Sequence, residues 1–180
     1  MEKFKIQNLK SQIEAHSPLT LRAKVISRVL MTLIAVGVFV TDQKTKALVE
    51  SHIRERAVVP VIAGFFNLTN TKNSGAVFGL FSESPVWWKT PLLIAISVVL
   101  LVAVVVLVVR TQHLRWESSI GLSLILGGAL SNLYDRIRAG LVEDFLDFYF
   151  RGYHWATFNL ADSAIVVGTA LIVAQVLFER

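Results

Sequence analysis

The sequence predicts a membrane all-α bundle of four transmembrane helices, with short strands in the connection between helices 1 and 2. Hydrophobic residues make up 54% of the 180 residues, and the mean hydropathy is +0.59. The charged residues gather between apolar segments, which is typical of a polytopic membrane protein. We expect a polar basic tail, 1–24, and a single membrane domain, 25–180. The predicted spans are 25–40, 91–109, 118–133 and 160–178.

Composition excludes several kinds of site and partner. The net charge is +5, and much of the excess lies in the tail, where anionic lipid head groups are better partners than nucleic acid. The chain has no cysteine, which excludes disulfides, a thiolate metal site and a cysteine nucleophile. Its 4 histidines do not form an HExxH motif. We therefore expect no metal and no cofactor.

The first span and the connection after it differ sharply in composition. Residues 25–40 are apolar except for Arg28, whose side chain can extend to the head groups, and the helix should begin near Ala23. A signal peptide is disfavoured because residues 39–41 are a poor cleavage site. The middle of the connection 41–89 mixes β-branched and aromatic residues with Asn and Gly, so it predicts short strands and turns.

The other spans follow from long apolar segments. Residues 91–109 carry no charge and approach the roughly 20 residues needed to cross a bilayer. The third span, 118–133, contains Gly121, Gly127 and Gly128, which let helix backbones approach closely. Segment 160–178 is the fourth span.

Four spans place both termini on one side of the membrane. The basic tail and the loop with Arg110 and Arg115 favour a cytoplasmic location for the termini. The connections 41–90 and 134–159 would then lie outside, and an active site formed by them would face outward.

Two aspartates near the membrane edge are candidate catalytic groups, because ionisable residues beside a span are costly. Asn159 is a plausible N-cap for the fourth span, with Asp162 in the first turn, where the helix dipole favours the ionised form. Asp144 stands among apolar residues, which raise the pKa of a carboxyl group. If the two face each other, they can share one proton, with Asp144 as the protonated member.

Other residues keep competing or supporting roles at this stage. By residue type, Asp147 and Glu143 compete with Asp144, although an extended strand would put them on the opposite face. Arg136 could pair with Asp135 or another carboxylate. Asp42 and Lys46 have the i, i+4 spacing of a helical ion pair.

The sequence resembles the lipoprotein signal peptidase (signal peptidase II) family. Four blocks carry the resemblance, which extends over nearly the whole chain beyond residue 24: DQKTK at 42–46, NSGAVF at 73–78, GGALSNLYDRIRAGLVEDFLDF at 127–148 and FNLADS at 158–163. The resemblance implies an aspartic endopeptidase of the bacterial inner membrane. Such enzymes remove signal peptides from diacylglyceryl-modified prolipoproteins just before the lipidated cysteine, and globomycin inhibits them.

The resemblance also implies that the connection 41–90, between helices 1 and 2, forms a small extramembrane β-cradle. It assigns roles by position as well. The catalytic pair falls on Asp144 and Asp162. The substrate-binding or dyad-supporting positions are Asp42, Lys46, Asn73, Gly75, Asn132, Arg136 and Asn159. Asp135 is expected to hold the local structure. The departures are Val77, where alanine is usual, Glu143, where a neutral residue is commoner, and the longer tail.

Two functions of other classes compete with peptidase activity. A proton-coupled transporter also uses intramembrane carboxylates, but the chain has no repeated half and no span interrupted by proline. A membrane scaffold would leave the ordered set of Asn, Asp and Arg residues unexplained. Substituting both aspartates by asparagine separates these functions, since a scaffold should tolerate the change and a transporter never cuts peptide.

Overall fold

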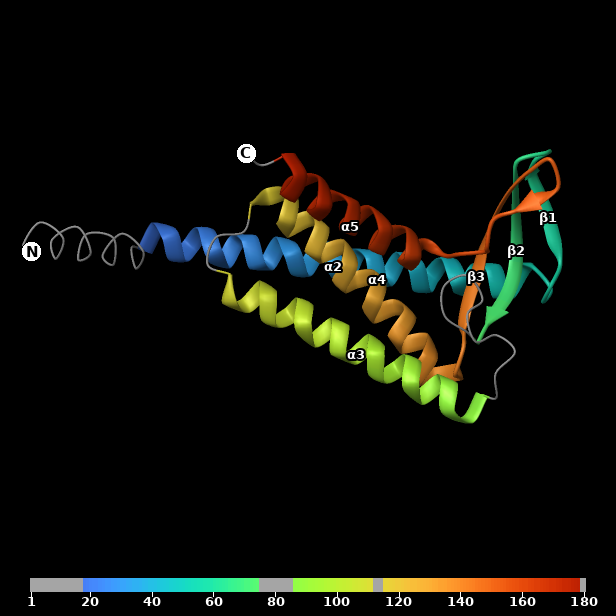
Figure 1. The fold of residues 1–180 in the computed structure, drawn as a ribbon, viewed down its shortest axis with the longest axis horizontal. Coiled ribbons are helices and arrows are strands. Elements are labelled where there is room, and N and C mark those ends of the chain that lie inside the picture. Colours follow the sequence, from blue (N-terminus) through green and yellow to red (C-terminus); the bar gives the residue numbers. More distant parts are fainter. Residues whose placement is uncertain (1–17, 75–85, 112–114, 179–180) are drawn as a thin grey trace, which may run out of the picture.

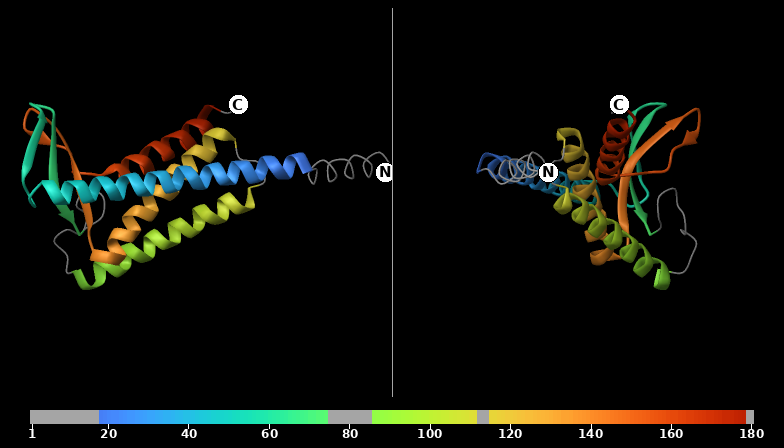
Figure 2. Two further views of the ribbon diagram at one scale, coloured as in Figure 1. Left: turned by 180° about the vertical axis from the view of Figure 1, so that it is seen from behind. Right: turned by 60° about the vertical axis from the view of Figure 1, so that its left-hand side comes forward.

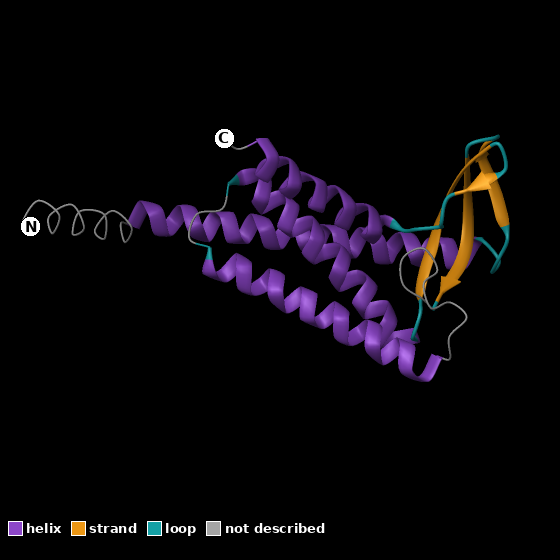
Figure 3. Ribbon diagram, viewed as in Figure 1, coloured by secondary structure: helices purple, strands orange, loops and turns teal. Residues whose placement is uncertain are grey.

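The computed structural model describes residues 18–74, 86–111 and 115–178. Its helices form one bundle, and its strands form a sheet at one end of that bundle (Figures 1 and 3). The first turn of α2 and the last turn of α5 lie at the end opposite the sheet (Figure 1). The helices are α2, Pro18–His52; α3, Val86–Arg110; α4, Trp116–Ala139; and α5, Leu160–Phe178.

Among the described residues, three helices are long and apolar enough to cross a membrane: Arg22–His52, Trp88–Arg110 and Leu160–Phe178. They contain the predicted spans 25–40, 91–109 and 160–178. The predicted span 118–133 is helical within α4, but α4 is too polar to be counted with them. It packs against α2, α3 and α5, which shield its polar side chains.

Helix α2 is longer than the predicted first span at both ends. It begins at Pro18 rather than near Ala23, and it continues past residue 40 to His52. The apolar segment ends at 40, but the helix persists because one stripe of its surface stays buried. This stripe contains Asp42, Lys46 and Val49, which follow one another at helical spacing.

The strands form one antiparallel sheet of order β1-β2-β3-β4, with bounds Val58–Ile62, Phe66–Asn73, Val142–Phe150 and Tyr153–His154. Strands β1 and β2 confirm the prediction for the first connection. The prediction that the whole β-cradle lies between the first two helices, α2 and α3, was wrong, because β3 and β4 come from the connection between α4 and α5. A hairpin alone is marginally stable, and β3 supplies Phe145, which packs on Val49 and Ile53 of the α2 end.

A β-bulge sets the register between β2 and β3. Leu68 pairs with Leu146 and Thr71 with Asp144, so two residues of β2, Thr69 and Asn70, stand opposite Phe145. Asn70 donates a hydrogen bond from Nδ2 to the carbonyl oxygen of Ile53 at 2.9 Å. The bulge therefore fixes the sheet to the end of α2.

Glycines allow close contact between helix backbones, as predicted. A Cβ on Gly121 would stand 2.7 Å from the carbonyl oxygen of Gly168, and one on Gly127 would stand 2.5 Å from that of Ala35. A Cβ on Gly128 would collide with the carbonyl oxygen of Ala161 in the first turn of α5. Figure 2 shows α4 running against α5 along this contact. Gly128 thus sets the distance between α4 and the residue that precedes Asp162.

We expect Gly128→Ala to destabilise the protein by about 1–3 kcal/mol, because the added methyl group meets backbone that cannot move aside. Thermal unfolding in detergent measures the effect. Gly37→Ala is the matched control, since a Cβ on Gly37 meets nothing within 4 Å. Equal melting temperatures for the two variants would contradict the close packing of α4 on α5.

Candidate functional site

Asn159 and Asp162 cap the first turn of α5, as the spacing predicts. The Asp162 backbone N–H donates to Asn159 Oδ1 at 2.9 Å, and the Asn159 backbone N–H donates to Asp162 Oδ2 at 3.3 Å. This reciprocal pair is a capping box. Asn132 of α4 donates from Nδ2 to Asp162 Oδ1 at 2.7 Å. Both Asp162 oxygens therefore accept hydrogen bonds, and the carboxylate is held at the end of a candidate span.

Asp144 lies on β3 and also contacts Asn159. Asn159 donates from Nδ2 to Asp144 Oδ1 at 2.8 Å, and Asn73 of β2 donates to Asp144 Oδ2 at 2.9 Å. Asp144 is 2% exposed. Asn159 thus contacts both Asp144 and Asp162, and it brings together a strand and a helix terminus.

Lys46 organises the support beneath this pair. Its Nζ lies 2.6 Å from Asp42 Oδ2 and 2.6 Å from Asp135 Oδ2, and it donates to Asn132 Oδ1 at 3.1 Å. The predicted Asp42–Lys46 ion pair is present and buried. Asp42 Oδ1 also accepts from the Ala161 backbone N–H at 2.9 Å. This network therefore fixes the helix turn that carries Asp162.

Arg136 hydrogen-bonds to the backbone of α4, and Asp135, which was considered as its partner, bonds to other residues. It donates from Nη1 to the carbonyl oxygen of Asn132 at 3.3 Å. Asp135 instead accepts from Lys46 and, at 2.7 Å, from Gln43 Nε2. The charge of Arg136 interacts with those of Asp162, Asp144 and Asp135. Arg136 is thus the half-buried positive charge beside the two carboxylates.

The environment of Asp144 favours its protonated form. Burial raises the pKa of Asp144 to about 7, against the opposing effect of the hydrogen bond from Asn73. The negative charge of Asp162 acts in the same direction as burial. At neutral pH Asp144 therefore holds a proton for much of the time, so the site can supply an acid.

The structure separates Asp147 from the site. Asn67 donates to Asp147 Oδ2 at 2.8 Å, and His154 Nδ1 lies 2.8 Å from Asp147 Oδ1. Neither neighbour belongs to the set around Asn159, so geometry favours Asp144 over Asp147. Gly75, expected at the site, lies outside the described residues.

Sequence reasoning missed two polar residues of this network. Ser131 donates to Asp42 Oδ2 at 2.7 Å, and Gln43 donates to Ser131 Oγ at 2.9 Å. The signal available was the i, i+4 spacing of Ser131 and Asp135 on α4. Among the described residues, no group of three or more Asp, Glu or His side chains could hold a metal ion.

Comparison with known proteins gives a consistent result. A family model described as signal peptidase (SPase) II matches residues 34–178. A lipoprotein signal peptidase of Solibacter usitatus (strain Ellin6076) is 42% identical over 144 residues, which cover 80% of this chain and 88% of that protein. One of Desulforapulum autotrophicum is 44% identical over 153 residues, which cover 84% of this chain and 94% of that protein.

Solved structures of similar proteins share the fold. Two are described as bacterial membrane enzyme structures obtained by the in meso method. The first gives a TM-score of 0.75 at 30% identity and covers 84% of this chain and 94% of its own. The second gives a TM-score of 0.74 at 32% identity, and the match covers 82% of this chain and 87% of the chain in that structure. The chain is thus a multi-pass membrane protein, and it belongs to the signal peptidase II family.

Proposed function

We propose that this protein is an aspartic endopeptidase that removes signal peptides from diacylglyceryl-modified prolipoproteins and cuts before the lipidated cysteine. The observation that carries the proposal is the contact of Asn159 with both Asp144 and Asp162. Two carboxylates held in different environments at a membrane edge suit acid and base roles. The names of the relatives support the substrate class.

In the proposed reaction, ionised Asp162 takes a proton from the attacking water, and protonated Asp144 donates a hydrogen bond to the peptide carbonyl. Hydrogen bonds from Asn132 and Asn159 hold Asp162 in place. The positive charge of Arg136 offsets the negative charge of the pair. Asn73 positions Asp144 from the sheet, so substrate would lie between the sheet and the helix ends.

We propose that α4 completes a set of four spans in the bacterial inner membrane. The first turn of α2 and the last turn of α5 would face the cytoplasm, since they share one end of the bundle (Figure 1). The sheet and the two carboxylates would face outward. Lipid-modified substrate would then approach from the outer leaflet, where its diacylglyceryl group can remain.

Cleavage of a diacylglyceryl-modified prolipoprotein by the detergent-purified protein tests this function. The same precursor without the lipid is the matched control, and globomycin is the inhibitor control. We expect cleavage of the lipidated substrate only, before its cysteine, and loss of cleavage with globomycin. A folded protein that cuts neither substrate, or both equally, would overturn the proposal.

The pH dependence of cleavage follows from the pKa of Asp144. Because the protonated form of Asp144 is the active one, kcat/KM should fall as pH rises above about 7, by about tenfold per pH unit. Asn73→Leu removes a hydrogen bond that lowers this pKa, so the alkaline limb should move to higher pH. A pH–rate series on both proteins measures the limb. An unmoved limb would show that it reports a group other than Asp144.

A further inference from the structure

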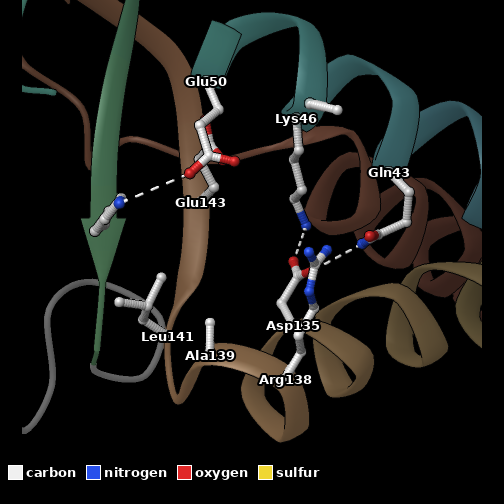
Figure 4. Close-up of a pocket in the computed structure, with 10 residues that line it drawn as sticks. Gln43, Lys46, Glu50, Asp135, Arg138, Ala139, Leu141 and Glu143 are labelled. Atoms are coloured by element: carbon white, nitrogen blue, oxygen red, sulfur yellow. Dashed lines mark hydrogen bonds and ion pairs between the residues drawn. The ribbon is translucent and has the colours of Figure 1, made fainter. Parts of the chain in front are cut away.

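A pocket of about 240 Å³ lies beside the candidate active site and is not used by the proposed reaction. It is bounded by α2, β2, β3 and the last turn of α4 (Figure 4). Glu143 lines it, and alternation along β3 places this side chain on the face opposite Asp144. The charged lining residues number three of each sign and are Lys46, Lys72, Arg138, Glu50, Asp135 and Glu143.

Glu143, which lines this pocket, carries an unsatisfied hydrogen-bond acceptor. The residue is 9% exposed, and its buried Oε1 has no hydrogen-bond partner among the described residues. A buried carboxylate oxygen without a donor is costly, so the site favours either a proton or an N–H donor from a ligand. Burial, together with the charge of Glu50, raises the pKa of Glu143 to about 7. A donor that binds there would remove this cost.

Arg138 supplies a charge of the opposite sign. It is exposed on α4, and Figure 4 draws no ion pair from it to the other pocket residues. Asp135, its neighbour on the helix, is already bonded by Lys46 and Gln43. An exposed guanidinium group suits a phosphate. The pocket therefore offers an acceptor on β3 and a phosphate-type donor on α4.

The pocket lies at the level where lipid head groups are expected. Lys46 of the pocket donates to Asn132, and Asn132 donates to Asp162 in the first turn of the candidate span α5. Arg138 and Glu143 both follow the end of the predicted span 118–133. A ligand with one positive and one negative group at this level matches the head group of a zwitterionic lipid.

We propose that this pocket binds the head group of an aminophospholipid. The primary ammonium donates to the Glu143 carboxylate, and the phosphate accepts from Arg138. A trimethylammonium head group has no N–H and cannot satisfy Glu143, and a glycerol head group has no positive charge. The site therefore distinguishes phosphatidylethanolamine from phosphatidylcholine and phosphatidylglycerol.

Lipid retention by the detergent-purified protein tests the proposal without reference to cleavage. The three phospholipids, with the same acyl chains, are titrated and counted on the intact protein by native mass spectrometry. We expect phosphatidylethanolamine to bind about tenfold more tightly than phosphatidylcholine or phosphatidylglycerol. Equal binding of all three would overturn the proposal. Equal affinity for free phosphoethanolamine would assign the site to a soluble ligand and overturn the lipid assignment.

Two variants give different signatures. Glu143→Leu should remove the preference for phosphatidylethanolamine over phosphatidylcholine, because the acceptor for the ammonium N–H is lost. Arg138→Gln should weaken all three lipids by the same factor and keep their order. Arg110→Gln is the matched control, since Arg110 is an exposed arginine at the last residue of α3 and does not line the pocket. It should change neither the lipid preference nor the affinities. An unchanged preference in Glu143→Leu would place the lipid elsewhere.

Discussion

Asp144→Asn and Asp162→Asn should each lower kcat/KM for the lipidated precursor by about 10³- to 10⁴-fold, because each removes one of the two proton-transfer groups. Both variants should fold. Asparagine has nearly the size of aspartate. In Asp162→Asn its Oδ1 can still accept the hydrogen bond from Asn132, and in Asp144→Asn its Oδ1 can still accept one of the two hydrogen bonds made to Asp144. Initial cleavage rates, beside thermal unfolding in detergent, separate loss of chemistry from loss of structure.

Asp147→Asn is the matched control for the pair. Asp147 is a buried carboxylate on the same strand, but it is bonded to Asn67 and His154 rather than to Asn159. We expect this variant to keep its cleavage rate within about tenfold of the unaltered protein, since it loses no proton-transfer group. If Asp147→Asn is inactive while Asp144→Asn still cuts, the catalytic assignment on β3 is wrong.

Lys46→Met should destabilise the protein by about 3–5 kcal/mol, since it leaves Asp42 and Asp135 without their buried counter-charge. Asp42 is fully buried, so water cannot replace the ammonium. The same change loosens the hold of Asp42 on the Ala161 N–H, so cleavage should fall as well. Unfolding by heat or denaturant in detergent measures the loss.

Lys44→Met provides the comparison on the same helix. Lys44 is exposed, and its charge can be lost at little cost. Adding Asp135→Asn to Lys46→Met should recover part of the stability, because one uncompensated carboxylate is removed. Equal stability of the two methionine variants would show that the buried network contributes nothing to the fold.

Local patterns in the sequence were sufficient for part of this site. The i, i+4 spacing of Asp42 and Lys46 predicted their ion pair, and the position of Asn159 before an apolar segment predicted the helix cap. Each of these features involves residues within one turn of each other. Their partners in the chain lie close enough for helix geometry alone to place them.

Contacts between distant segments could not be predicted in the same way. Asn73 and Asp144 are 71 residues apart, and they meet only because β2 pairs with β3. By residue type Asp147 was as good a candidate as Asp144, and the strand pairing brings Asp144, rather than Asp147, to Asn73 and Asn159. Apolar content also failed to predict the full length of α2, and it placed α4 among the apolar spans although α4 is more polar than the other helices. In both cases burial against other parts of the protein replaces hydrophobicity.

The bond between Asn70 and the end of α2 has a consequence for motion. The Ile53 carbonyl oxygen accepts from the Asn70 side chain, and the Arg56 backbone N–H donates to the Asn70 carbonyl at 2.8 Å. Proteins open locally in contiguous cooperative units. The last turn of α2 and strand β2 should therefore exchange their amide protons with deuterium together. Strand β2 then stays attached to the end of α2. Space for an entering peptide must come from movement of elements that are not hydrogen-bonded to the end of α2.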